Sequence, residues 1–361
     1  MNKKSINKIT WIISFGINLW PLFLFIPQKA LILPSYLASL RFPLIIYSKS
    51  MLVCIACILF TGITFAFQNV NPNSINHLSG FIIFLISIPI INFLYLKNKE
   101  EFIKSISIIS IFNMLLGFLL FFNIISFENL RGLNQIRDSD GNITRVFYES
   151  ASLLAAFNLF FIRRRILKYI LYIALVIYLL FFIKSFFIIV LLGLRYYSSK
   201  NKFKLKSKIY IFLSILIASF FTIYISSIIR PDILLSLGYK YTQFIVILKE
   251  IEKTPFFGHG WGYFINEFAS DENQPYQTEM QLPMLLLQIG IAGTILYLTT
   301  LFILIKIVSP KLSTAFSRFF IYLIIGFNNP WLFLPSWYLT AILILEPTDQ
   351  KNEKYCSHLH P

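Results

Sequence analysis

Long apolar segments recur along most of this chain, and no other feature constrains its fold as strongly. Of its 361 residues, 57% are hydrophobic and only 13% are charged, which leaves too little polar surface for a soluble domain. A helix needs about 20 apolar residues to cross a bilayer, and segments near that length repeat throughout. Their polarity does not alternate, which disfavours a membrane barrel. The sequence therefore predicts an all-α, polytopic integral membrane protein.

The apolar pattern predicts about twelve transmembrane helices and a large periplasmic loop that carries a surface helix. The predicted spans cover approximately residues 11–26, 31–47, 51–67, 78–96, 105–126, 148–162, 168–182, 184–197, 209–228, 281–305, 316–328 and 331–346. They form a transmembrane bundle (1–228), the large loop (229–280), the C-terminal spans (281–346) and a cytoplasmic tail (347–361).

Positive charge sets the orientation of the predicted bundle. The net charge is +16, and the cations lie in short runs between apolar spans, where cytoplasmic Lys and Arg are expected. That placement favours anionic inner-leaflet lipid over nucleic acid as the partner. The runs assigned to the cytoplasmic side are Lys97–Lys99 with Lys104, Arg163–Arg165 with Lys168, Lys200 to Lys208, and Lys306 with Lys311.

The segment from Ile166 to Tyr197 lies between two of these basic runs. It must therefore cross the membrane an even number of times to keep both runs on one side. Its length suits two short helices. We predict a hairpin that turns near Lys184-Ser185.

Arginines without lysine mark the loop that precedes the predicted sixth span: Arg131, Arg137 and Arg145. A guanidinium binds phosphate oxygens bidentately and stays charged. This set, together with Arg230 beyond the ninth span, indicates a substrate that bears pyrophosphate. The alternative for Arg131 and Arg137 is pairing with loop acids in solvent. Arg145 differs because it lies with Glu149 at the predicted mouth of the bundle.

A glycine-rich motif, Gly258-His259-Gly260-Trp261-Gly262, follows in the large loop. Its glycines permit unusual backbone angles and close approach. The aromatic residues Phe256, Phe257, Trp261 and Tyr263 offer flat faces for a sugar or for the membrane interface, and His259 is a further candidate for contact with the substrate. The alternative is an interfacial aromatic turn. No second His or Cys stands at metal-ligand spacing from His259, and Cys54-x-x-Cys57 lies inside an apolar run. We therefore predict no metal and no cofactor.

Glu279 is the strongest candidate for a catalytic base. The sequence places it in the first turn of the long apolar helix after the loop, where the helix dipole and partial burial suit a general base. Helix capping, with Thr278 as the N-cap, is the alternative role and is compatible with the first.

Within the same loop, apolar residues at helical spacing from Leu234 to Leu248 predict an amphipathic helix that ends at Thr254-Pro255. Such a helix would lie on the membrane surface. The alternative is that it merely seals the bundle.

These residues resemble motifs of the O-antigen polymerase and ligase superfamily of bacterial inner-membrane glycosyltransferases. Glu279-Met280, nine residues, Gly290, two residues and Gly293 reproduce the spacing of a ligase motif that has histidine in the place of Glu279. Glutamate at that position favours a polymerase over a ligase.

Further elements extend the resemblance from about Arg145 to Pro330. They are Arg145–Ser150, similar to an arginine element before a mid-chain span; Lys184-Ser185, where many members have Ser-Arg; Gly258–Gly262, similar to a Gly-x-Gly-x-Gly turn; and Asn328–Pro330 near the last span.

The resemblance implies a metal-independent polymerase of O-antigen or a related surface polysaccharide, located in the bacterial inner membrane with its active site facing the periplasm. The implied substrates are an undecaprenyl-pyrophosphate-linked oligosaccharide donor and acceptor, and a chain-length regulator is a candidate partner. Glu279 and Arg145 take the catalytic roles. The substrate-binding residues are then Arg131, Arg137, Lys184, Arg230, His259 and Trp261.

Other functions remain as alternatives. A ligase shares the motifs, and a transporter or flippase of lipid-linked oligosaccharide suits twelve spans and the internal charges Arg41 and Lys184. The long outer loop with its surface helix would be superfluous in a transporter. A second class of glycosyltransferase uses acids in the first outer loop, and the loop near Pro27 to Ala30 has none. A structural scaffold is weaker still.

Overall fold

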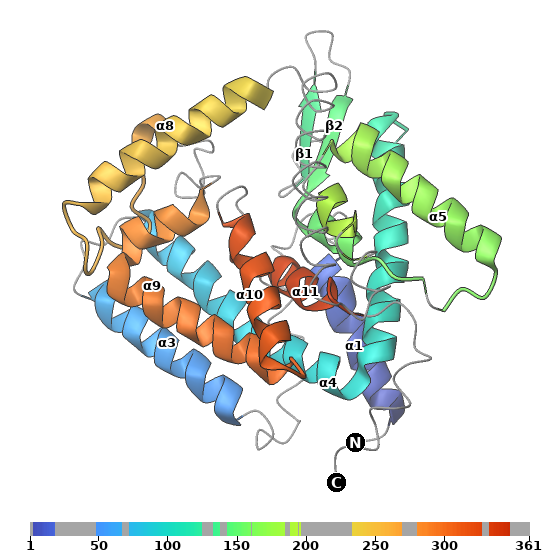
Figure 1. Ribbon diagram of the computed structural model, residues 1–361, viewed down its shortest axis with the longest axis horizontal. Coiled ribbons are helices and arrows are strands. Elements are labelled where there is room, and N and C mark those ends of the chain that lie inside the picture. Colours follow the sequence, from blue (N-terminus) through green and yellow to red (C-terminus); the bar gives the residue numbers. More distant parts are fainter. Residues whose placement is uncertain are drawn as a thin grey trace, which may run out of the picture. The chain divides into compact units, whose positions relative to one another are not determined.

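The computed structural model describes residues 3–18, 48–66, 72–124, 133–137, 143–159, 161–184, 188–193, 195, 233–268, 280–326 and 332–346. Within them the chain is mostly helical, as predicted. In chain order the elements are α1 (Lys3–Asn18), α3 (Ser48–Ala66), α4 (Pro72–Phe121), β1 (Leu133–Arg137), β2 (Ile143–Tyr148), η3 (Glu149–Ala156), α5 (Arg165–Ile177), η4 (Tyr178–Ile183), α8 (Ile233–Ile251), η5 (Asn266–Phe268), α9 (Gln281–Ile307), α10 (Leu312–Ile325) and α11 (Pro335–Leu343) (Figure 1).

The chain divides into two compact units, which we describe one at a time. Unit 1 comprises Met1–Ile9, Gln28–Lys99 and Leu234–Ala341. Unit 2 comprises Thr10–Pro27, Glu100–Ile233 and Ile342–Pro361.

Three helices among the described residues are long and apolar enough to cross a membrane. They are Asn73–Phe121 within α4, Arg165–Ile183, which joins α5 to η4, and Gln281–Ile307, which is α9. Shorter apolar helices, Met51–Ile63 and Leu312–Ile324, also coincide with predicted spans. The predicted spans 31–47 and 209–228 lie outside the described residues, so the total of about twelve stays a prediction.

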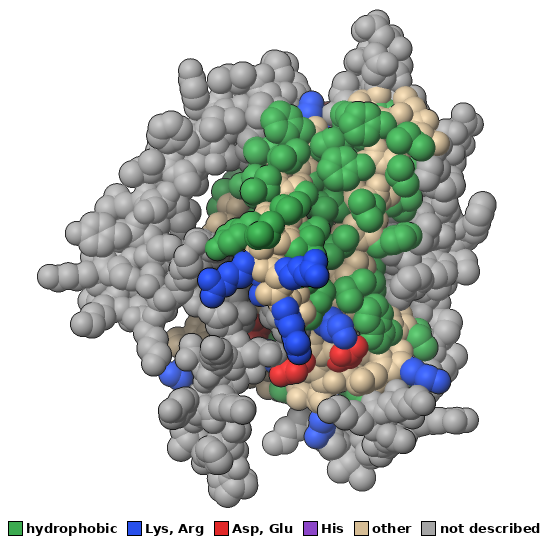
Figure 2. Space-filling model, turned by 90° about the vertical axis from the view of Figure 1, so that its right-hand side faces the viewer, with side chains coloured by type: hydrophobic (Ala, Val, Ile, Leu, Met, Phe, Trp, Pro, Cys, Tyr) green, Lys and Arg blue, Asp and Glu red, His purple; other side chains and the backbone are tan. Residues whose placement is uncertain are grey.

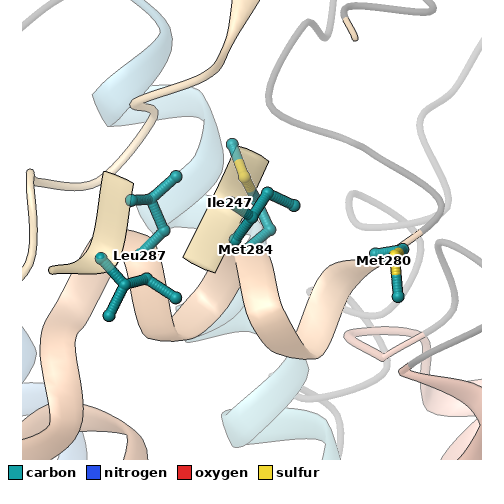
Figure 3. Packing of buried hydrophobic residues seen from close by; sticks show 5 residues of the cluster. Ile247, Met280, Met284 and Leu287 are labelled. Atoms are coloured by element: carbon teal, nitrogen blue, oxygen red, sulfur yellow. The ribbon is translucent and has the colours of Figure 1, made fainter. Parts of the chain in front are cut away.

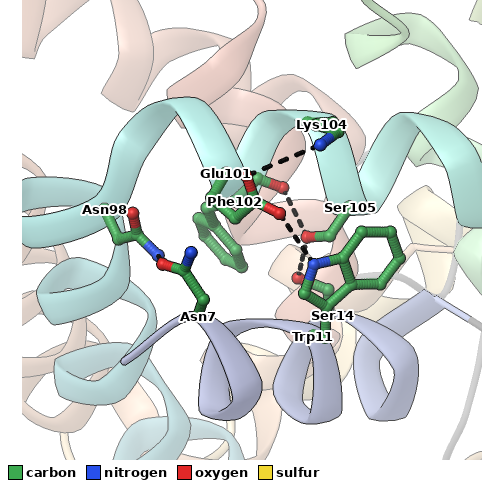
Figure 4. Close-up of polar contacts among 8 residues, drawn as sticks. All are labelled: Asn7, Trp11, Ser14, Asn98, Glu101, Phe102, Lys104 and Ser105. Carbon is green, nitrogen blue, oxygen red and sulfur yellow. Dashed lines mark hydrogen bonds and ion pairs between the residues drawn. The ribbon is translucent and has the colours of Figure 1, made fainter. Parts of the chain in front are cut away.

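The helix α4 is two helices joined at Asn98, whose φ of −146° and ψ of 43° are not helical. The predicted spans 78–96 and 105–126 fall on these two parts, although the second part ends at Phe121. The basic run Lys97–Lys99 lies at the junction, as a short connection between two spans requires. In unit 1, the Asn98 side chain donates to Asn7 Oδ1 over 2.9 Å (Figure 4).

In unit 2, polar side chains join α1 to the second part of α4 (Figure 4). Trp11 Nε1 donates to Glu101 Oε1 over 2.8 Å, and Lys104 Nζ lies 3.7 Å from the other oxygen of that carboxylate. The buried hydroxyls of Ser14 and Ser105 are 2.6 Å apart. A buried polar group is stable only when it is hydrogen-bonded, so these pairs fix the register of the two helices.

The prediction of a membrane span at 148–162 is wrong. The chain there leaves the β1–β2 hairpin through the 3-10 helix η3, and residues 157–159 and 162–164 are not helical. The segment is nevertheless buried, and the Asn158 backbone N–H donates to Ser107 Oγ over 3.1 Å in unit 2. A short apolar run cannot by itself distinguish a buried irregular segment from a helix.

The helix formed by α5 and η4 is the most outward-facing candidate span. Only 28% of its most apolar stretch is buried, against 67% for α4 and 56% for α9. Figure 2 views the side of the molecule on which α5 lies, and apolar side chains gather there in one broad area with basic and acidic side chains along its lower edge. The exposed arginines Arg163–Arg165 stand at the start of α5. This pattern is typical of a lipid-facing helix with a cytoplasmic basic end.

The core of unit 1 contains a buried cation, Arg318 in α10. Its guanidinium donates to the Val308 carbonyl at the end of α9 over 2.8 Å and to the Tyr95 hydroxyl in α4 over 3.1 Å. A guanidinium near the last carbonyls of a helix complements the helix dipole. Arg318 therefore joins three helices of this unit.

Candidate functional site

The helix α9 is broken at Gly290. Its φ of 68° and ψ of −175° lie in a region that only glycine adopts without strain, so residues 281–289 and 291–307 form separate helical parts. The first part begins at Gln281 with Met280 as the N-cap. The expected N-cap role of Thr278 and the placement of Glu279 in the first helical turn are therefore wrong. Glu279 precedes the N-cap and itself lies outside the described residues.

The glycine turn after α8 lies directly against this break. Breaking a helix leaves backbone groups without their helical partners, and these groups must bond elsewhere when they are buried. Here the turn provides the partners in both directions, so the two sequence motifs form one backbone structure within unit 1. The bonds are His259 N to Leu287 O (2.8 Å), Gly260 N to Gln288 O (2.9 Å), Ile291 N to Pro255 O (2.9 Å) and Ala292 N to Phe256 O (3.2 Å).

Glycine is required on both sides of this contact. Gly258 has a φ of 72°, and a Cβ atom there would overlap the Gln288 carbonyl. A Cβ atom on Gly290 would overlap the Phe256 carbonyl. Gly262 likewise has a φ of 78° and packs against the backbone at Ser74. The expectation that the glycines of the turn serve unusual angles and close approach is confirmed for Gly258 and Gly262, whereas the role of Gly290 was not predicted.

The side chain of His259 is held in a defined orientation. Its ring stacks on Tyr263 with the centroids 4.4 Å apart and an interplanar angle of 18°. Nε2 lies 3.0 Å from the Glu250 backbone carbonyl. Because a carbonyl can only accept, Nε2 carries the hydrogen, and in the neutral ring Nδ1 then has the free lone pair. His259 as a whole is half-buried.

An ion pair stands beside this histidine at the end of α8. Lys253 Nζ lies 2.6 Å from Glu250 Oε1. The hydrogen bond from Lys253 lowers the pKa of the Glu250 carboxyl, and the same bond raises the pKa of Lys253. Burial, followed by the nearby Glu250 charge, raises the pKa of Tyr263. At neutral pH the cluster therefore holds an ionised Glu250, a charged Lys253 and a neutral Tyr263 hydroxyl.

Trp261 does not have the open face that contact with a sugar requires. It is 1% exposed, and its ring packs against His77 and Phe81 at centroid distances of 5.2 and 4.8 Å. The Ser74 hydroxyl donates to its backbone carbonyl over 2.5 Å. This arrangement gives Trp261 a packing role. The exposed aromatic side chains of the turn are instead Phe256 and Phe257, each 66% exposed.

The helix α8 confirms the expected helical segment in the loop, and it packs on α9 through one face. Ile247 and Ile251 contact Met280, Met284 and Leu287 of α9 (Figure 3). This face differs from the apolar stripe that the sequence indicated, because Tyr241 and Leu248 of that stripe are exposed. The helix therefore seals against α9 and presents a second apolar face outward.

Two residues with predicted roles, Arg145 and Lys184, lie at the end of one helix in unit 2. Arg145 lies in β2 opposite Ile136, beside an irregularity in the pairing at Ile136/Arg137. Its Nε donates to the Ile183 carbonyl over 2.7 Å, at the end of the helix that α5 and η4 form. Lys184 follows in a left-handed conformation with a φ of 51°, so the helix ends where the hairpin turn was predicted. The turn itself, at 185–187, lies outside the described residues.

The remaining predicted substrate contacts cannot be placed as side chains. Arg131 and Arg230 lie outside the described residues, and of Arg137 only the position in β1 is described. Among the residues that the structure describes, no group of three His, Cys, Asp or Glu side chains could hold a metal ion. The contacts of His259 with the Glu250 carbonyl and the Tyr263 ring were not predicted, although both partners lie within ten residues of it along the chain.

Comparison of the chain with models of known protein families, with curated proteins and with solved structures finds no match. The functional argument therefore rests on the residues of this chain. They form a glycine turn on a broken helix in unit 1 and an arginine at a helix end in unit 2.

Proposed function

We propose that this chain is a membrane glycosyltransferase that polymerises lipid-linked oligosaccharide repeat units at the periplasmic face of the bacterial inner membrane. The observation that carries the proposal is the glycine turn bonded to the break in α9. Irregular backbone within membrane helices is tolerated where it is buried in protein or lines a site, and substrate sites of membrane proteins often form at such breaks. Glu279 immediately precedes the N-cap of this broken helix.

The reaction needs one base and one group that stabilises a leaving pyrophosphate. A hydroxyl of the acceptor sugar attacks the anomeric carbon of the donor, and Glu279 takes its proton as the new glycosidic bond forms. The bond from the anomeric carbon to the lipid pyrophosphate breaks, and its electron pair leaves with the pyrophosphate. The donor is already activated, so the chemistry requires no nucleotide.

Arg145 is suited to the leaving group. Its guanidinium is charged at any working pH and offers several donors, of which Nε bonds the Ile183 carbonyl. Lys184 adds a second cation next in the chain to that carbonyl. Such fixed cations stabilise the charge that develops on phosphate oxygens in the transition state.

His259 is suited to binding the acceptor. The hydrogen bond at Nε2 and the stack on Tyr263 orient its ring, so Nδ1 can accept a hydrogen bond from a sugar hydroxyl.

The test of the proposal is Glu279→Gln in cells that make the repeat unit. Glutamine has nearly the same shape but cannot accept the proton of the acceptor at neutral pH, so polymerisation should stop while a single repeat unit still reaches the cell surface. Glu267→Gln, an exposed acid of the same loop, serves as the matched control and should leave the polymer unchanged. A polymer ladder of wild-type intensity with Glu279→Gln would exclude Glu279 as the base. Loss of even the single unit would point to a flippase or ligase.

The orientation is tested independently by reporter fusions after Asp138, Asn201 and Asp271. The basic runs predict that the first and third reporters face the periplasm and the second faces the cytoplasm. A cytoplasmic signal at Asp271 would contradict the proposal, because the acceptor glycan is available only outside.

A further inference from the structure

A second apolar face of α8 continues into the exposed tip of the glycine turn. Tyr241 and Leu248, two helical turns apart, are 69% and 39% exposed. The opposite face, with Gln243 and Ile247, is buried. Five residues after α8 ends, Phe256 and Phe257 expose their rings. Exposed apolar side chains that gather in one area, rather than singly, mark a surface that contacts a partner or a membrane.

This exposed area adjoins the outward face of a candidate membrane span. Along the second part of α9, Ile291, Ile295, Ile303 and Ile307 are all exposed. At about 100° per residue this row winds around the helix, so apolar side chains face outward over its whole length, and we call this row the outward stripe. The Phe256 carbonyl accepts from the backbone of Ala292, the neighbour of Ile291. Phe256 and Phe257 therefore stand where the outward stripe of α9 begins.

The lysines near one end of α9 indicate which end faces the cytoplasm. The 17 residues 291–307 are about 25 Å long as a helix, close to the thickness of the hydrocarbon core. Lys306 and Lys311 follow at its far end, as expected for the cytoplasmic side. The Gly290 end then lies near the opposite membrane surface, which is where aromatic side chains collect.

We propose that the outward face of α8 and the Phe256–Phe257 pair rest in the outer interfacial layer of the bilayer, and that the lipid holds the glycine turn at the depth of the α9 break. The surface is defined by Tyr241, Leu248, Phe256 and Phe257. Its partner is the bilayer itself. The inference does not depend on the proposed polymerase activity.

The chemistry favours lipid over a glycan or a charged protein as the occupant. Phenylalanine has no polar group for sugar hydroxyls, and two adjacent exposed Phe residues suit insertion beside acyl chains. Residues 233–268 contain three lysines (Lys240, Lys249, Lys253) and three acids (Glu250, Glu252, Glu267), so their formal charges cancel. Contact with the membrane should therefore be apolar in origin and insensitive to salt.

The test places a fluorescent probe at single cysteines of the full-length protein in nanodiscs of phosphatidylcholine. Cys356 is replaced by alanine, whereas Cys54 and Cys57 are buried and stay. The test variants are Tyr241→Cys, Phe256→Cys and Phe257→Cys. The matched controls are Thr242→Cys and Lys253→Cys, exposed positions of the same segment, and Ile295→Cys on the stripe of α9.

Lipid that carries a nitroxide near the top of the acyl chain quenches probes that lie beside it. Quenching of the three test probes should exceed that of the probes at positions 242 and 253 by about two-fold or more. High salt should not change the ratio between the two groups of probes. An aqueous quencher that reaches the test probes as well as the controls would overturn the proposal. Protection from both quenchers would also overturn it, because a protein would then cover the surface.

A measurement on the unaltered protein guards against misfolded variants. A photoactivatable lipid that reacts with neighbouring side chains should label the wild-type peptide containing Phe256 and Phe257, together with peptides from the outward stripe of α9. Labelling of α9 without labelling of that peptide would contradict the proposal.

Discussion

The two regions that contain the candidate site residues are built in different ways. In unit 1 the glycine turn and the broken helix α9 are joined by backbone hydrogen bonds, and Gly258 and Gly290 leave no room for a side chain. In unit 2 the contact depends on a side chain, because Arg145 reaches the Ile183 carbonyl through its Nε. The first region tolerates almost no change of residue, whereas the second depends on one guanidinium.

This difference predicts how each region fails. A substitution at a glycine of the turn should disturb folding, and activity should fall as a consequence. A substitution of Arg145 should disturb activity first, since the backbone pairing of β1 with β2 does not depend on its side chain. Variants of the two regions therefore separate positioning from chemistry.

The largest effect is expected for Gly290→Ala. The added Cβ atom would overlap the Phe256 carbonyl and the positive φ would be strained, which together should lower the stability by about 2–4 kcal/mol. Gly62→Ala is the matched control, because nothing lies within 4 Å of the added atom in α3. Melting of the detergent-purified variants measures both. Equal melting temperatures would show that the contact of turn and helix is not tight.

Arg145→Lys should reduce polymer formation by about 10-fold to 100-fold without loss of expression, because an ammonium group cannot bond the Ile183 carbonyl and a phosphate in the same forked geometry. Arg163→Lys, an exposed cation of the same unit, should be silent. The polymer made per molecule of membrane-inserted protein is the measurement. Wild-type activity with Arg145→Lys would reduce Arg145 to a structural contact.

His259→Gln should lower the apparent affinity for the acceptor by about 10-fold while the melting temperature changes little. Glutamine can still donate to the Glu250 carbonyl, but it offers no ring nitrogen in the position of Nδ1. Tyr263→Phe keeps the stacked ring and serves as the control with near-normal affinity. If both variants lose the same amount, the effect is not specific to Nδ1 of His259, and the assigned acceptor contact is wrong.

The smallest effect concerns the exposed pair Glu250–Lys253. The pKa of Glu250 is lowered in the folded state, so its contribution to stability is present above the unfolded pKa and is lost as the pH falls through the folded value. The pKa of Lys253 is raised, so its contribution is lost at alkaline pH. Lys253→Met should therefore melt slightly below wild type at neutral pH and converge with it only once the pH has fallen below the lowered pKa of Glu250. Lys249→Met, outside this pair, should show no such convergence.

The pattern of apolar residues predicted where the helices lie, but it did not predict where a helix is broken. Continuous apolar runs located α3, α5, both parts of α4, α9 and α10, because the bilayer length is a strong constraint. The break at Gly290 could not be read, since one glycine in an apolar run is also compatible with close helix packing. The break forms because the turn at Pro255–Gly260 bonds to the backbone groups that the broken helix leaves without partners. That turn lies outside the apolar run and could not be read from it.

The hairpin of β1 and β2 had a signal that the sequence analysis did not use. Asp140-Gly141 is a dipeptide typical of tight turns between strands. Short segments that contain apolar residues precede and follow it, Leu133 to Ile136 and Ile143 to Phe147. The residues that follow the hairpin are apolar, and an apolar run suggests a membrane span. For that reason Ala151–Ala156 were included in a predicted span. Similarly, the spacing of α8 revealed an apolar stripe but not which face α9 covers, because that depends on Met284 and Leu287.

The central claim is that this chain forms glycosidic bonds between lipid-linked repeat units. The direct measurement uses the purified protein in proteoliposomes with a polyprenyl-pyrophosphate-linked repeat unit as the only substrate. We expect products with two or more repeat units together with free polyprenyl pyrophosphate, and loss of both with Glu279→Gln. Movement of the substrate across the bilayer without a new glycosidic bond would contradict the account.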